Sequence, residues 1–342
     1  MPTYDPEKLA RLVERVTGAR PSAVTPMPGG ASTRSYLRVE GAFDGARACV
    51  AMFVPDAAPE EVTQGSATAP TRWPFLEVHD LLESRGVRVP RVFGEACDDG
   101  LVLLEDLGDD TLGAHVEGHP DRRAAVYRRA VEDLAKAQRA LATLPEGSLV
   151  ATRAFDEVLL RWELDHFREW ALDARGRELS PGERAEFDEI AGALAAEIAS
   201  WPRGFVHRDY QSRNLMVTRD GALAWIDFQD ALLGPRAYDL VALLNDSYVD
   251  IDQPFIDARL DDYAAAAGLD SSGRAEVGRQ FDRLTVQRKL KDAGRFVFID
   301  RVKKNPSFLP YFEPSLAKVR RALARLDSDP AMKRLAELVE RA

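Results

Sequence analysis

Three side chains near the middle of the chain have the groups that phosphoryl transfer requires. Asp209 is followed by Asn214 five positions later and by Asp227 thirteen positions after that. A carboxylate can orient an attacking hydroxyl and accept its proton, while a second carboxylate and an amide oxygen can hold the Mg²⁺ ions that bridge nucleotide phosphates. A single Asp or Asn in a loop is usually only a turn or cap residue. Three of them at this spacing, each beside an apolar run typical of a strand, predict a kinase site.

The loop around Asp209 also has the residue order of the protein-kinase catalytic loop. The segment His207-Arg208-Asp209, with Asn214 beyond it, matches the pattern H-R-D-x-x-x-x-N. We therefore interpret Asp209 as the catalytic base, and Asn214 and Asp227 as ligands of Mg²⁺. We expect His207 and Arg208 to brace the loop, because a histidine after an apolar run is more often a hydrogen-bonded structural residue.

A glycine turn in the N-terminal part is a weaker signal for phosphate binding. Gly29 and Gly30 lie between two strand-like segments, and glycines allow backbone N–H groups to approach phosphate oxygens closely. Ser32, Thr33 and Arg34 follow and can add hydroxyl and guanidinium donors. A hairpin turn without a ligand is the alternative interpretation. The position of the turn, first in a sheet lobe ahead of the catalytic loop, favours phosphate binding.

The adenine of ATP is expected at the junction of two lobes, residues 103–108. Its edge would pair with main-chain groups around Glu105 and Leu107. Backbone recognition leaves almost no trace in a sequence, so this assignment rests on position alone.

The third strand lacks the lysine that protein kinases direct at the α- and β-phosphates. Met52 stands in its place, which leaves Glu77 without the partner that such a lysine would provide. Three explanations remain open. Arg34 or Arg38 replaces the lysine, the metal ions and the glycine turn hold the phosphates alone, or the nucleotide site is degenerate.

The surrounding pattern predicts the elements that must position these residues. Strands are expected at 22–27, 33–40, 47–54, 91–95 and 101–105, with helices at 6–17 and 72–84. Helical periods follow at 120–144, 155–174, 181–200, 235–246, 255–267, 274–299 and 315–325. One hairpin, 215–217 with 223–226, interrupts them and brings Asn214 and Asp227 together at its base. We expect an α+β, bilobal protein-kinase-like fold, with a small antiparallel-sheet N-lobe for the nucleotide at 1–107 and a mainly helical C-lobe, with the catalytic loop and acceptor site, at 108–342.

Composition excludes several other classes of protein. Hydrophobic residues make up 45% of the 342 residues and charged residues 30%, an ordinary globular balance. The formal net charge of −10 argues against nucleic-acid binding, and no apolar run is long enough for a membrane span. The N-terminus has no signal-peptide pattern, and Cys49 and Cys97 are expected to be reduced thiols. We expect a cytoplasmic protein, and the sequence indicates no protein partner.

A basic helix late in the chain predicts part of the acceptor site. One side of the helix expected at 274–299 has Gln287, Lys291, Arg295 and Phe298, while its apolar residues face the core. This cationic, hydrogen-bonding side would suit an acceptor that has a carboxylate. A solvated basic helix face is the alternative. In the catalytic loop, Tyr210 and Arg213 are further candidate acceptor contacts.

The site segments resemble a known family. The segments His207-Arg208-Asp209, Asn214-Leu215-Met216, Ile226-Asp227-Phe228-Gln229-Asp230 and Gly234-Pro235-x-x-Tyr238-Asp239-Leu240 are similar to the aminoglycoside/choline phosphotransferase family, most specifically over residues 204–246. The resemblance implies a kinase-like fold, ATP use and Mg²⁺ dependence, with Asp209 as the base and Asn214 and Asp227 as metal ligands. It also implies that Tyr238 and Asp239 are mainly structural and pack the helix beneath the loop.

A narrower resemblance is to the bacterial anomeric kinases of cell-wall sugar recycling. The matching segments are Ala31-Ser32-x-Arg34-x-Tyr36-x-Arg38, Val50-x-Met52, His207-Arg208-Asp209-Tyr210-x-x-Arg213-Asn214-Leu215-Met216, Phe228-Gln229-Asp230-Ala231 and Gln287-Arg288-x-Leu290-Lys291. This resemblance implies phosphorylation of N-acetylmuramate and N-acetylglucosamine at the anomeric hydroxyl, and an apolar residue where Met52 stands. We then expect Arg288 to meet the lactyl carboxylate of N-acetylmuramate. Residues 111–150 show little resemblance.

Two other functions stay open. Another small-molecule kinase of the same fold would act on an aminoglycoside, choline or another amino alcohol. A polycation site would then form from the acidic run of Asp246, Asp250, Asp252 and Asp257, although such a run is more often a solvated surface. A nucleotide-binding pseudokinase that serves as a regulatory module is supported only by Met52. The intact Asp209, Asn214 and Asp227 oppose it.

The substitution Asp209→Asn tests the assignment of the base. We expect it to abolish phosphoryl transfer, because an amide cannot accept the proton of the attacking hydroxyl. Binding of Mg-ATP, measured by calorimetry, should stay largely intact. Unchanged turnover in this variant would show that Asp209 is not the base.

Overall fold

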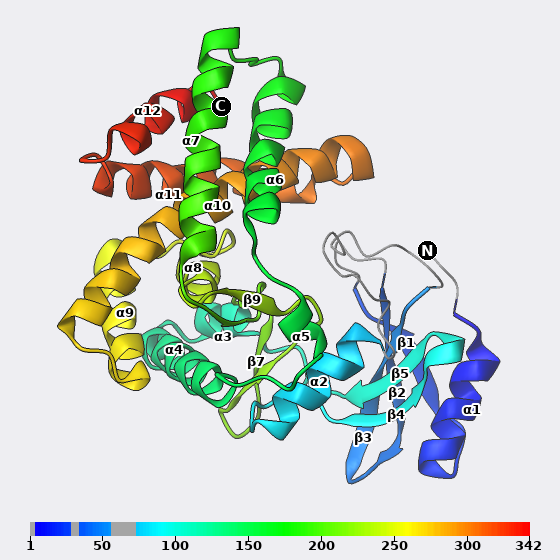
Figure 1. The fold of residues 1–342 in the computed structure, drawn as a ribbon. Coiled ribbons are helices and arrows are strands. Elements are labelled where there is room, and N and C mark those ends of the chain that lie inside the picture. Colours follow the sequence, from blue (N-terminus) through cyan, green and yellow to red (C-terminus); the bar gives the residue numbers. More distant parts are fainter. Residues whose placement is uncertain (1–3, 29–33, 56–72) are drawn as a thin grey trace.

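A five-stranded antiparallel sheet forms the first part of the molecule. The computed structural model describes residues 4–28, 34–55 and 73–342. The strands are ordered β1-β2-β3-β5-β4, with α1 and α2 beside them (Figure 1). The elements are α1 Pro6–Thr17, β1 Ala23–Pro26, β2 Ser35–Phe43, β3 Ala46–Phe53, α2 Pro74–Ser84, β4 Val92–Ala96, the 3₁₀ turn η1 Cys97–Asp99 and β5 Leu101–Glu105.

Helix α1 covers one face of this sheet. The Asp5 carboxylate accepts hydrogen bonds from the backbone N–H groups of Glu7 and Lys8, and the helix ends at Gly18 with a φ of 78°. The apolar side chains of α1 and of the sheet face below it form a small core, which consists of Leu9, Leu12, Val13, Leu37, Val39, Phe43, Cys49, Ala51, Leu101 and Leu103.

The opposite face of the sheet packs into a second and larger core. Met52, Val102 and Leu104 alternate along their strands with residues of the small core, so they point to the other side. They belong to one apolar cluster together with α2 and the helices of the C-terminal part. Apolar packing therefore crosses the lobe boundary that we expect after Leu107, and that boundary stays a prediction.

Hydrogen bonds also join the first part to the second. The carboxylate of Glu77 in α2 accepts a hydrogen bond of 2.5 Å from the backbone N–H of Leu149. The carbonyl oxygen of Arg88 accepts one of 2.8 Å from the backbone N–H of Trp225. These bonds and the shared core hold α2 against the C-terminal part.

Helices make up most of the C-terminal part. The α-helices are α3 Leu112–Gly118, α4 Arg123–Ala140, α5 Leu149–Thr152, α6 Glu157–Phe167, α7 Pro181–Ser200, α8 Tyr238–Leu244, α9 Gln253–Ala267, α10 Ser271–Lys303, α11 Phe312–Arg325 and α12 Pro330–Val339. Shorter turns are η2 Pro120–Arg122, the π turn η3 Arg168–Leu172, η4 Asp173–Arg175 and η5 Pro306–Tyr311. Among the described residues, no helix is long and apolar enough to cross a bilayer.

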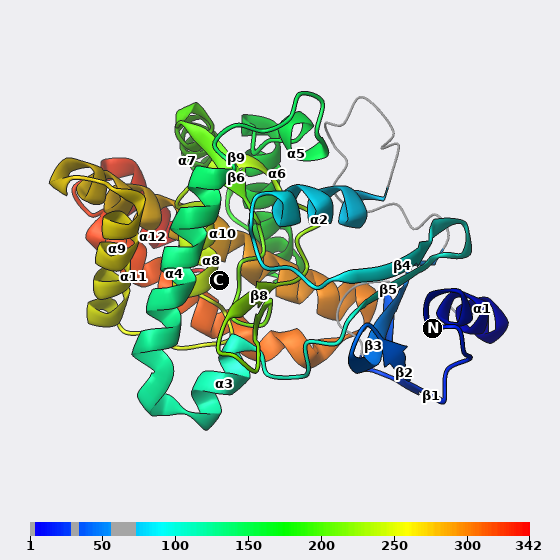
Figure 2. The same cartoon turned by 90° about the horizontal axis from the view of Figure 1, so that it is seen from below.

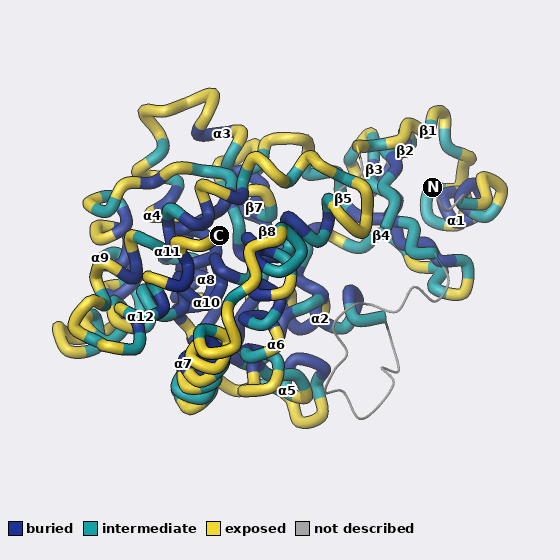
Figure 3. Tube along the Cα trace, turned by 90° about the horizontal axis from the view of Figure 1, so that it is seen from above, coloured by how far each residue is buried: buried dark blue, intermediate teal, exposed yellow. Residues whose placement is uncertain are grey.

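The 33-residue helix α10 forms the centre of this part. It contacts α6, α7, α8, α9 and α11, and the view from below shows α4 and α9 packed at one side of it (Figure 2). The tube coloured by burial shows the buried trace concentrated where these helices meet, with exposed residues on their outer faces (Figure 3). Helix α10 can therefore bring side chains from the core to the catalytic loop.

Two short ladders lie between the sheet and the helices. Strands β7 Leu215–Val217 and β8 Leu223–Trp225 form the predicted hairpin, while β6 Arg203–Val206 pairs with β9 Leu232–Pro235. The sequence predicts only the hairpin in this half of the chain. The β6–β9 ladder was not predicted because its strands are distant in sequence and no turn signal joins them.

The predicted α+β arrangement, a small antiparallel sheet followed by a mainly helical part, is confirmed. Helices α1 and α7 have the bounds that periodicity predicts. Helices α3, α5 and α12 were not predicted. The first two have only 7 and 4 residues, which is too short for a helical period to be recognised. Helix α12 begins at an Asp329 cap followed by Pro330, a local signal that could have revealed it.

The substitution Gly294→Ala should destabilise the packing of α10 against α6 and η3. A Cβ at this position would lie 2.5 Å from the carbonyl oxygen of His166 and 2.9 Å from the Cα of Phe167. These backbone atoms can move away only if the helix packing changes. We therefore expect a loss of about 1–3 kcal/mol in the free energy of unfolding measured with urea. Gly182→Ala is the matched control, because a Cβ there meets nothing within 4 Å. Equal stability of the two variants would contradict this packing.

Candidate active site

A buried carboxylate from α8 holds the start of the catalytic loop. Asp239 accepts hydrogen bonds from the backbone N–H groups of His207, at 2.7 Å, and Arg208, at 3.0 Å. Burial raises the pKa of Asp239 to about 7, against the opposing effect of these donors and of Arg288. Arg208 has a φ of 78°, a left-handed conformation that costs energy for a non-glycine residue. The loop is thus kept in a strained shape by a contact beneath it.

His207 fixes the loop from the other side. Its side chain is fully buried and its Nε2 donates to the carbonyl oxygen of Ile226 at 3.1 Å. Burial lowers its pKa to about 4, so the imidazole is neutral at physiological pH. The bond ties the start of the loop to the residue before Asp227, which agrees with the bracing role predicted for His207.

Asp246 holds the middle of the loop. Its position corrects the interpretation of this residue as part of a solvated surface. It was counted in an acidic run interpreted as a solvated surface, but it is fully buried. Its Oδ2 accepts hydrogen bonds from the backbone N–H and the hydroxyl of Ser212, at 2.9 and 2.5 Å. Its Oδ1 accepts from the backbone N–H of Tyr248 at 3.1 Å. Asp246 is therefore engaged with the loop and does not contribute to a polycation site.

The predicted base, Asp209, lies against Arg288 of α10. Arg288 Nη2 is 3.2 Å from Asp209 Oδ1, and its Nη1 donates to the carbonyl oxygen of Arg208 at 2.8 Å. About one-third of the Asp209 side chain is exposed. Burial raises the pKa of Asp209, but Arg288, Lys291 and Arg208 together outweigh it and hold that pKa below its usual value. The base is therefore ionised and still reachable by an acceptor.

The position of Arg288 corrects its predicted role. Its side chain is fully buried, with the guanidinium 4.8 Å from the ring centroid of Tyr238. A side chain without exposed surface cannot meet a carboxylate of the acceptor. Arg288 instead orients Asp209 and the backbone before it.

The predicted contacts of Tyr210 and Gln287 with the acceptor are corrected for the same reason. Both are fully buried. The hydroxyl of Tyr210 donates to the carbonyl oxygen of Ala130 at 2.9 Å, and the side-chain amide of Gln287 donates to Glu163 at 2.7 Å. In this structure both residues serve packing and hydrogen bonding beneath the site.

Two predicted acceptor residues keep exposed surface. Lys291 has 17% of its side chain exposed and pairs with Asp292 at 3.0 Å. Arg213 is exposed, and its guanidinium lies 3.5 Å from the ring centroid of Tyr248. Contact of either residue with an acceptor stays a prediction.

The hairpin brings the two predicted metal ligands together. The backbone N–H of Ile226 donates to the carbonyl oxygen of Asn214 at 3.0 Å, and Asn214 Nδ2 lies 3.4 Å from Asp227 Oδ2. The same Nδ2 donates to the carbonyl oxygen of Asp209 at 2.8 Å, which leaves Asn214 Oδ1 for a cation. Gln229 Nε2 donates to Asp227 Oδ1 at 2.9 Å. Sequence reasoning did not assign a role to Gln229.

This pair suits Mg²⁺ shared with nucleotide phosphates. Partial burial and then the charge of Asp209 raise the pKa of Asp227, and a bound cation would oppose both effects. Asp227 has a φ of 62°, a strained conformation of the kind found at functional sites. The described residues hold no cluster of three or more His, Cys, Asp or Glu side chains able to bind a metal alone. Mg²⁺ usually takes one or two protein ligands together with phosphate and water, and Asn214 Oδ1 and the Asp227 carboxylate would supply two.

The structure narrows the explanations for the missing lysine. Met52 is fully buried in the large core, and Glu77 has a backbone donor as its partner. Arg38 pairs with Asp106 at 2.7 Å and with Asp109 at 2.9 Å, so its guanidinium is engaged. Arg34 Nη1 lies 3.7 Å from Asp227 Oδ1, which makes it the cation beside the metal ligands. Gly29, Gly30, Ser32 and Thr33 lie outside the described residues.

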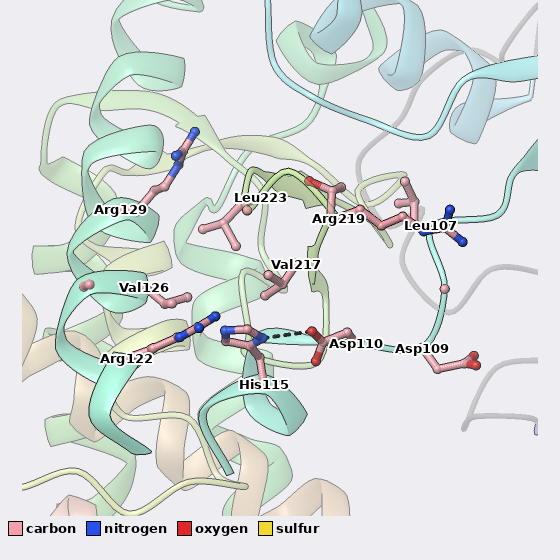
Figure 4. A pocket seen from close by; sticks show the side chains of 14 residues that line it. Leu107, Asp109, Asp110, His115, Arg122, Val126, Arg129, Val217, Arg219 and Leu223 are labelled. Carbon is pink, nitrogen blue, oxygen red and sulfur yellow. Dashed lines mark hydrogen bonds and ion pairs between the residues drawn. The ribbon is translucent and has the colours of Figure 1, made fainter. Parts of the chain in front are cut away.

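The segment between β5 and α3 borders a pocket of about 560 Å³ (Figure 4). Leu107 contributes to its lining, as do Val217 and Leu223, which pair across the hairpin. Met216 points to the opposite hairpin face, because side chains alternate along a strand. The Leu107 side chain thus lines a pocket beside the hairpin. At the end of β5, the Glu105 side chain pairs with Arg88 at 2.6 Å. The predicted adenine contacts of Glu105 and Leu107 stay predictions.

Comparison with known proteins places this geometry in a family. Residues 23–278, about three-quarters of the chain, match the sequence model of the phosphotransferase enzyme family. The chain belongs to the phosphotransferase enzyme family. The match covers the sheet, the catalytic loop and both predicted metal ligands, so the site described above lies within the region typical of these phosphotransferases.

Two curated relatives of this chain have the same name. A protein of Pseudomonas aeruginosa named N-acetylmuramate/N-acetylglucosamine kinase is 33% identical over 326 residues, which is 93% of this chain and 88% of the relative. A protein of Neisseria meningitidis serogroup B with the same name is 32% identical and covers 97% of this chain and 95% of its own length.

Solved structures of other phosphotransferases share the fold. The GDP complex of aminoglycoside 2'-phosphotransferase-IIIa has a TM-score of 0.59 at 14% identity, over 94% of this chain and 99% of that chain. Choline kinase LicA from Streptococcus pneumoniae has a TM-score of 0.58 at 13% identity, over 91% and 97%. These comparisons confirm the kinase-like fold and say nothing about the acceptor.

Arg288→Met tests the role of the buried guanidinium. Removal of this cation should raise the pKa of Asp209. Activity depends on the ionised base, so the acid limb of the kcat profile should move to higher pH, with a fall in kcat of roughly 10- to 100-fold from lost orientation. Steady-state kinetics over a pH series measure both effects. Arg279→Met is the control on the same helix, because Arg279 is exposed and pairs with Glu276 on the same helix. An unshifted acid limb would contradict this role of Arg288.

Proposed function

We propose that this protein is an ATP- and Mg²⁺-dependent kinase that phosphorylates the anomeric hydroxyl of N-acetylmuramate and N-acetylglucosamine. The observation that supports it most is the similarity to two proteins named N-acetylmuramate/N-acetylglucosamine kinase over nine-tenths or more of the chain. The ionised Asp209 beside the Asn214–Asp227 pair is the arrangement that such a transfer requires. Such a kinase would work in the cytoplasm, where ATP and recycled cell-wall sugars meet.

In the proposed mechanism, Asp209 accepts a hydrogen bond from the anomeric hydroxyl and takes its proton as the oxygen attacks the γ-phosphorus of ATP. Arg288 keeps the carboxylate ionised and fixes the direction of Oδ1. Positioning of this kind is the main contribution that a protein makes to phosphoryl transfer. The transfer leaves ADP and a sugar 1-phosphate.

The phosphates would be held from two sides. Asn214 Oδ1 and the Asp227 carboxylate would hold Mg²⁺, which when bound neutralises charge that develops on the phosphate oxygens. Gln229 orients the Asp227 carboxylate through a hydrogen bond of 2.9 Å. Arg34, 3.7 Å from Asp227, would supply the cation that Met52 does not provide. Arg34 stands four positions after Gly30 in the sequence, which suits contact with the same phosphates.

A screen of acceptors tests this function. We expect ATP consumption by the purified protein with N-acetylmuramate and N-acetylglucosamine, and none with kanamycin, choline or homoserine. Product phosphate should be released by mild acid, because the product is an anomeric ester. Turnover should lie at roughly 1–100 s⁻¹. Asp209→Asn protein is the control for contaminating kinases.

Two outcomes would assign the protein differently. Activity confined to kanamycin or choline would move it to the aminoglycoside or amino-alcohol kinases. Binding of ATP without turnover of any acceptor would support the pseudokinase alternative.

A further inference from the structure

The guanidinium of Arg213 is held in one orientation at the surface of the catalytic loop. Its central carbon lies 3.5 Å from the ring centroid of Tyr248 and 5.5 Å from that of Tyr311. Its Nη2 donates to the hydroxyl of Tyr311 at 3.1 Å. Stacking over an aromatic ring restrains the plane of the guanidinium and leaves its in-plane N–H groups for other acceptors.

Three hydrogen bonds of one carboxylate explain why Arg213 and Tyr248 meet. Asp246 binds Ser212, the residue before Arg213, and also the backbone of Tyr248. The catalytic loop and the segment after α8 are therefore joined at the point where the two side chains leave the backbone. Arg213 remains exposed while its direction is fixed.

Aromatic rings extend from Arg213 towards η5. Tyr248 and Tyr311 meet edge to face, with centroids 4.6 Å apart at 85°. Phe296 of α10 lies 6.2 Å from Tyr311 and 6.1 Å from Phe308, the latter nearly parallel at 12°. Tyr248, Tyr311 and Phe308 are partly exposed. A row of partly exposed rings beside a cation suits a ligand that has both a ring with C–H faces and an anionic group.

This cluster lies close to the proposed base. Arg213 stands four positions after Asp209 in the same short loop. Burial raises the pKa of Tyr248, and the charge of Asp209 adds a smaller contribution in the same direction. Arg288, the cation nearest to Asp209, is fully buried. Lys291 is mostly buried and pairs with Asp292. Among the described residues, no carboxylate pairs with Arg213, so its charge is available to a ligand.

We propose that Arg213 is the carboxylate-binding residue of the acceptor site, with Tyr248 and Tyr311 as its positioning residues. This inference rests on the proposed function and deepens it. Arg213 would bind the lactyl carboxylate of N-acetylmuramate, which N-acetylglucosamine lacks. One protein could then accept both sugars through contacts common to them, and Arg213 would determine the preference for the acidic one.

Arg213→Met and wild-type protein, each assayed with both sugars, test this inference. The loss of a charge-assisted hydrogen bond should lower kcat/KM for N-acetylmuramate by roughly 10- to 100-fold. The value for N-acetylglucosamine should change by less than about 3-fold, as should the KM for ATP. Arg213→Lys should recover only part of the loss, because an ammonium cannot form the planar two-bond contact. Arg219→Met, which removes an exposed arginine from the hairpin, is the charge-matched control.

Tyr311→Phe provides a second measurement that does not remove the charge. It deletes the hydroxyl that accepts from Arg213 and keeps the ring. We expect a smaller loss, about 2- to 10-fold, again specific for N-acetylmuramate.

The other outcomes overturn the inference in distinct ways. Equal losses for both sugars would show that Arg213 supports the loop and does not bind the carboxylate. A raised KM for ATP with both sugars would assign Arg213 to the nucleotide phosphates, the other anions near Asn214. An unchanged ratio of the two kcat/KM values, with wild-type turnover of both sugars, would overturn this inference alone. Turnover of neither sugar by the wild type would overturn the proposed function as well.

Discussion

The geometry of the site depends on buried carboxylates that hold the catalytic loop from below. Asp239 binds two consecutive backbone N–H groups at the start of the loop, and Asp246 binds Ser212 in its middle. A buried carboxylate is expensive unless its oxygens are hydrogen-bonded. These bonds meet that requirement and at the same time maintain a strained loop, in which Arg208 has a φ of 78°. Such a conformation costs on the order of 1–3 kcal/mol and persists only where the surroundings define it.

Asp209, as the proposed base, needs two properties that ordinarily conflict. Asp209 must be reachable by a hydroxyl, and it must stay ionised although most of its side chain is buried. Arg288 resolves the conflict, because it donates to Asp209 from the buried side and leaves the other side open. The guanidinium is carried by α10, the longest helix of the described chain, whose contacts with five other helices fix its position. The base is therefore coupled to the core of the C-terminal part.

The arginines near the site differ in burial, and burial determines which groups each guanidinium can contact. Arg288 is enclosed and acts on protein groups. Arg34 lies beside Asp227, at the proposed phosphate side, and Arg213 lies exposed beside Tyr248 and Tyr311, at the proposed acceptor side. Met52, where protein kinases have a lysine, is part of the apolar core that the sheet shares with α2. Charge is thus absent at position 52 of the third strand and is supplied by arginines in other segments.

The sequence by itself determined the two-part fold and the candidate chemistry at Asp209, Asn214 and Asp227. Those predictions depend on local periodicity and on spacing within one loop and one hairpin, which the chain encodes over short distances. It did not reveal the β6–β9 ladder, the burial of Tyr210, Gln287 and Arg288, or the clamps made by Asp239 and Asp246. The spacing of the late helix placed Gln287 on a side that suits a ligand, and the family resemblance suggested the same for Arg288. Only the tertiary structure decided that both point into the protein, because burial depends on which distant elements pack against a helix face, and a single sequence has no local signal for that.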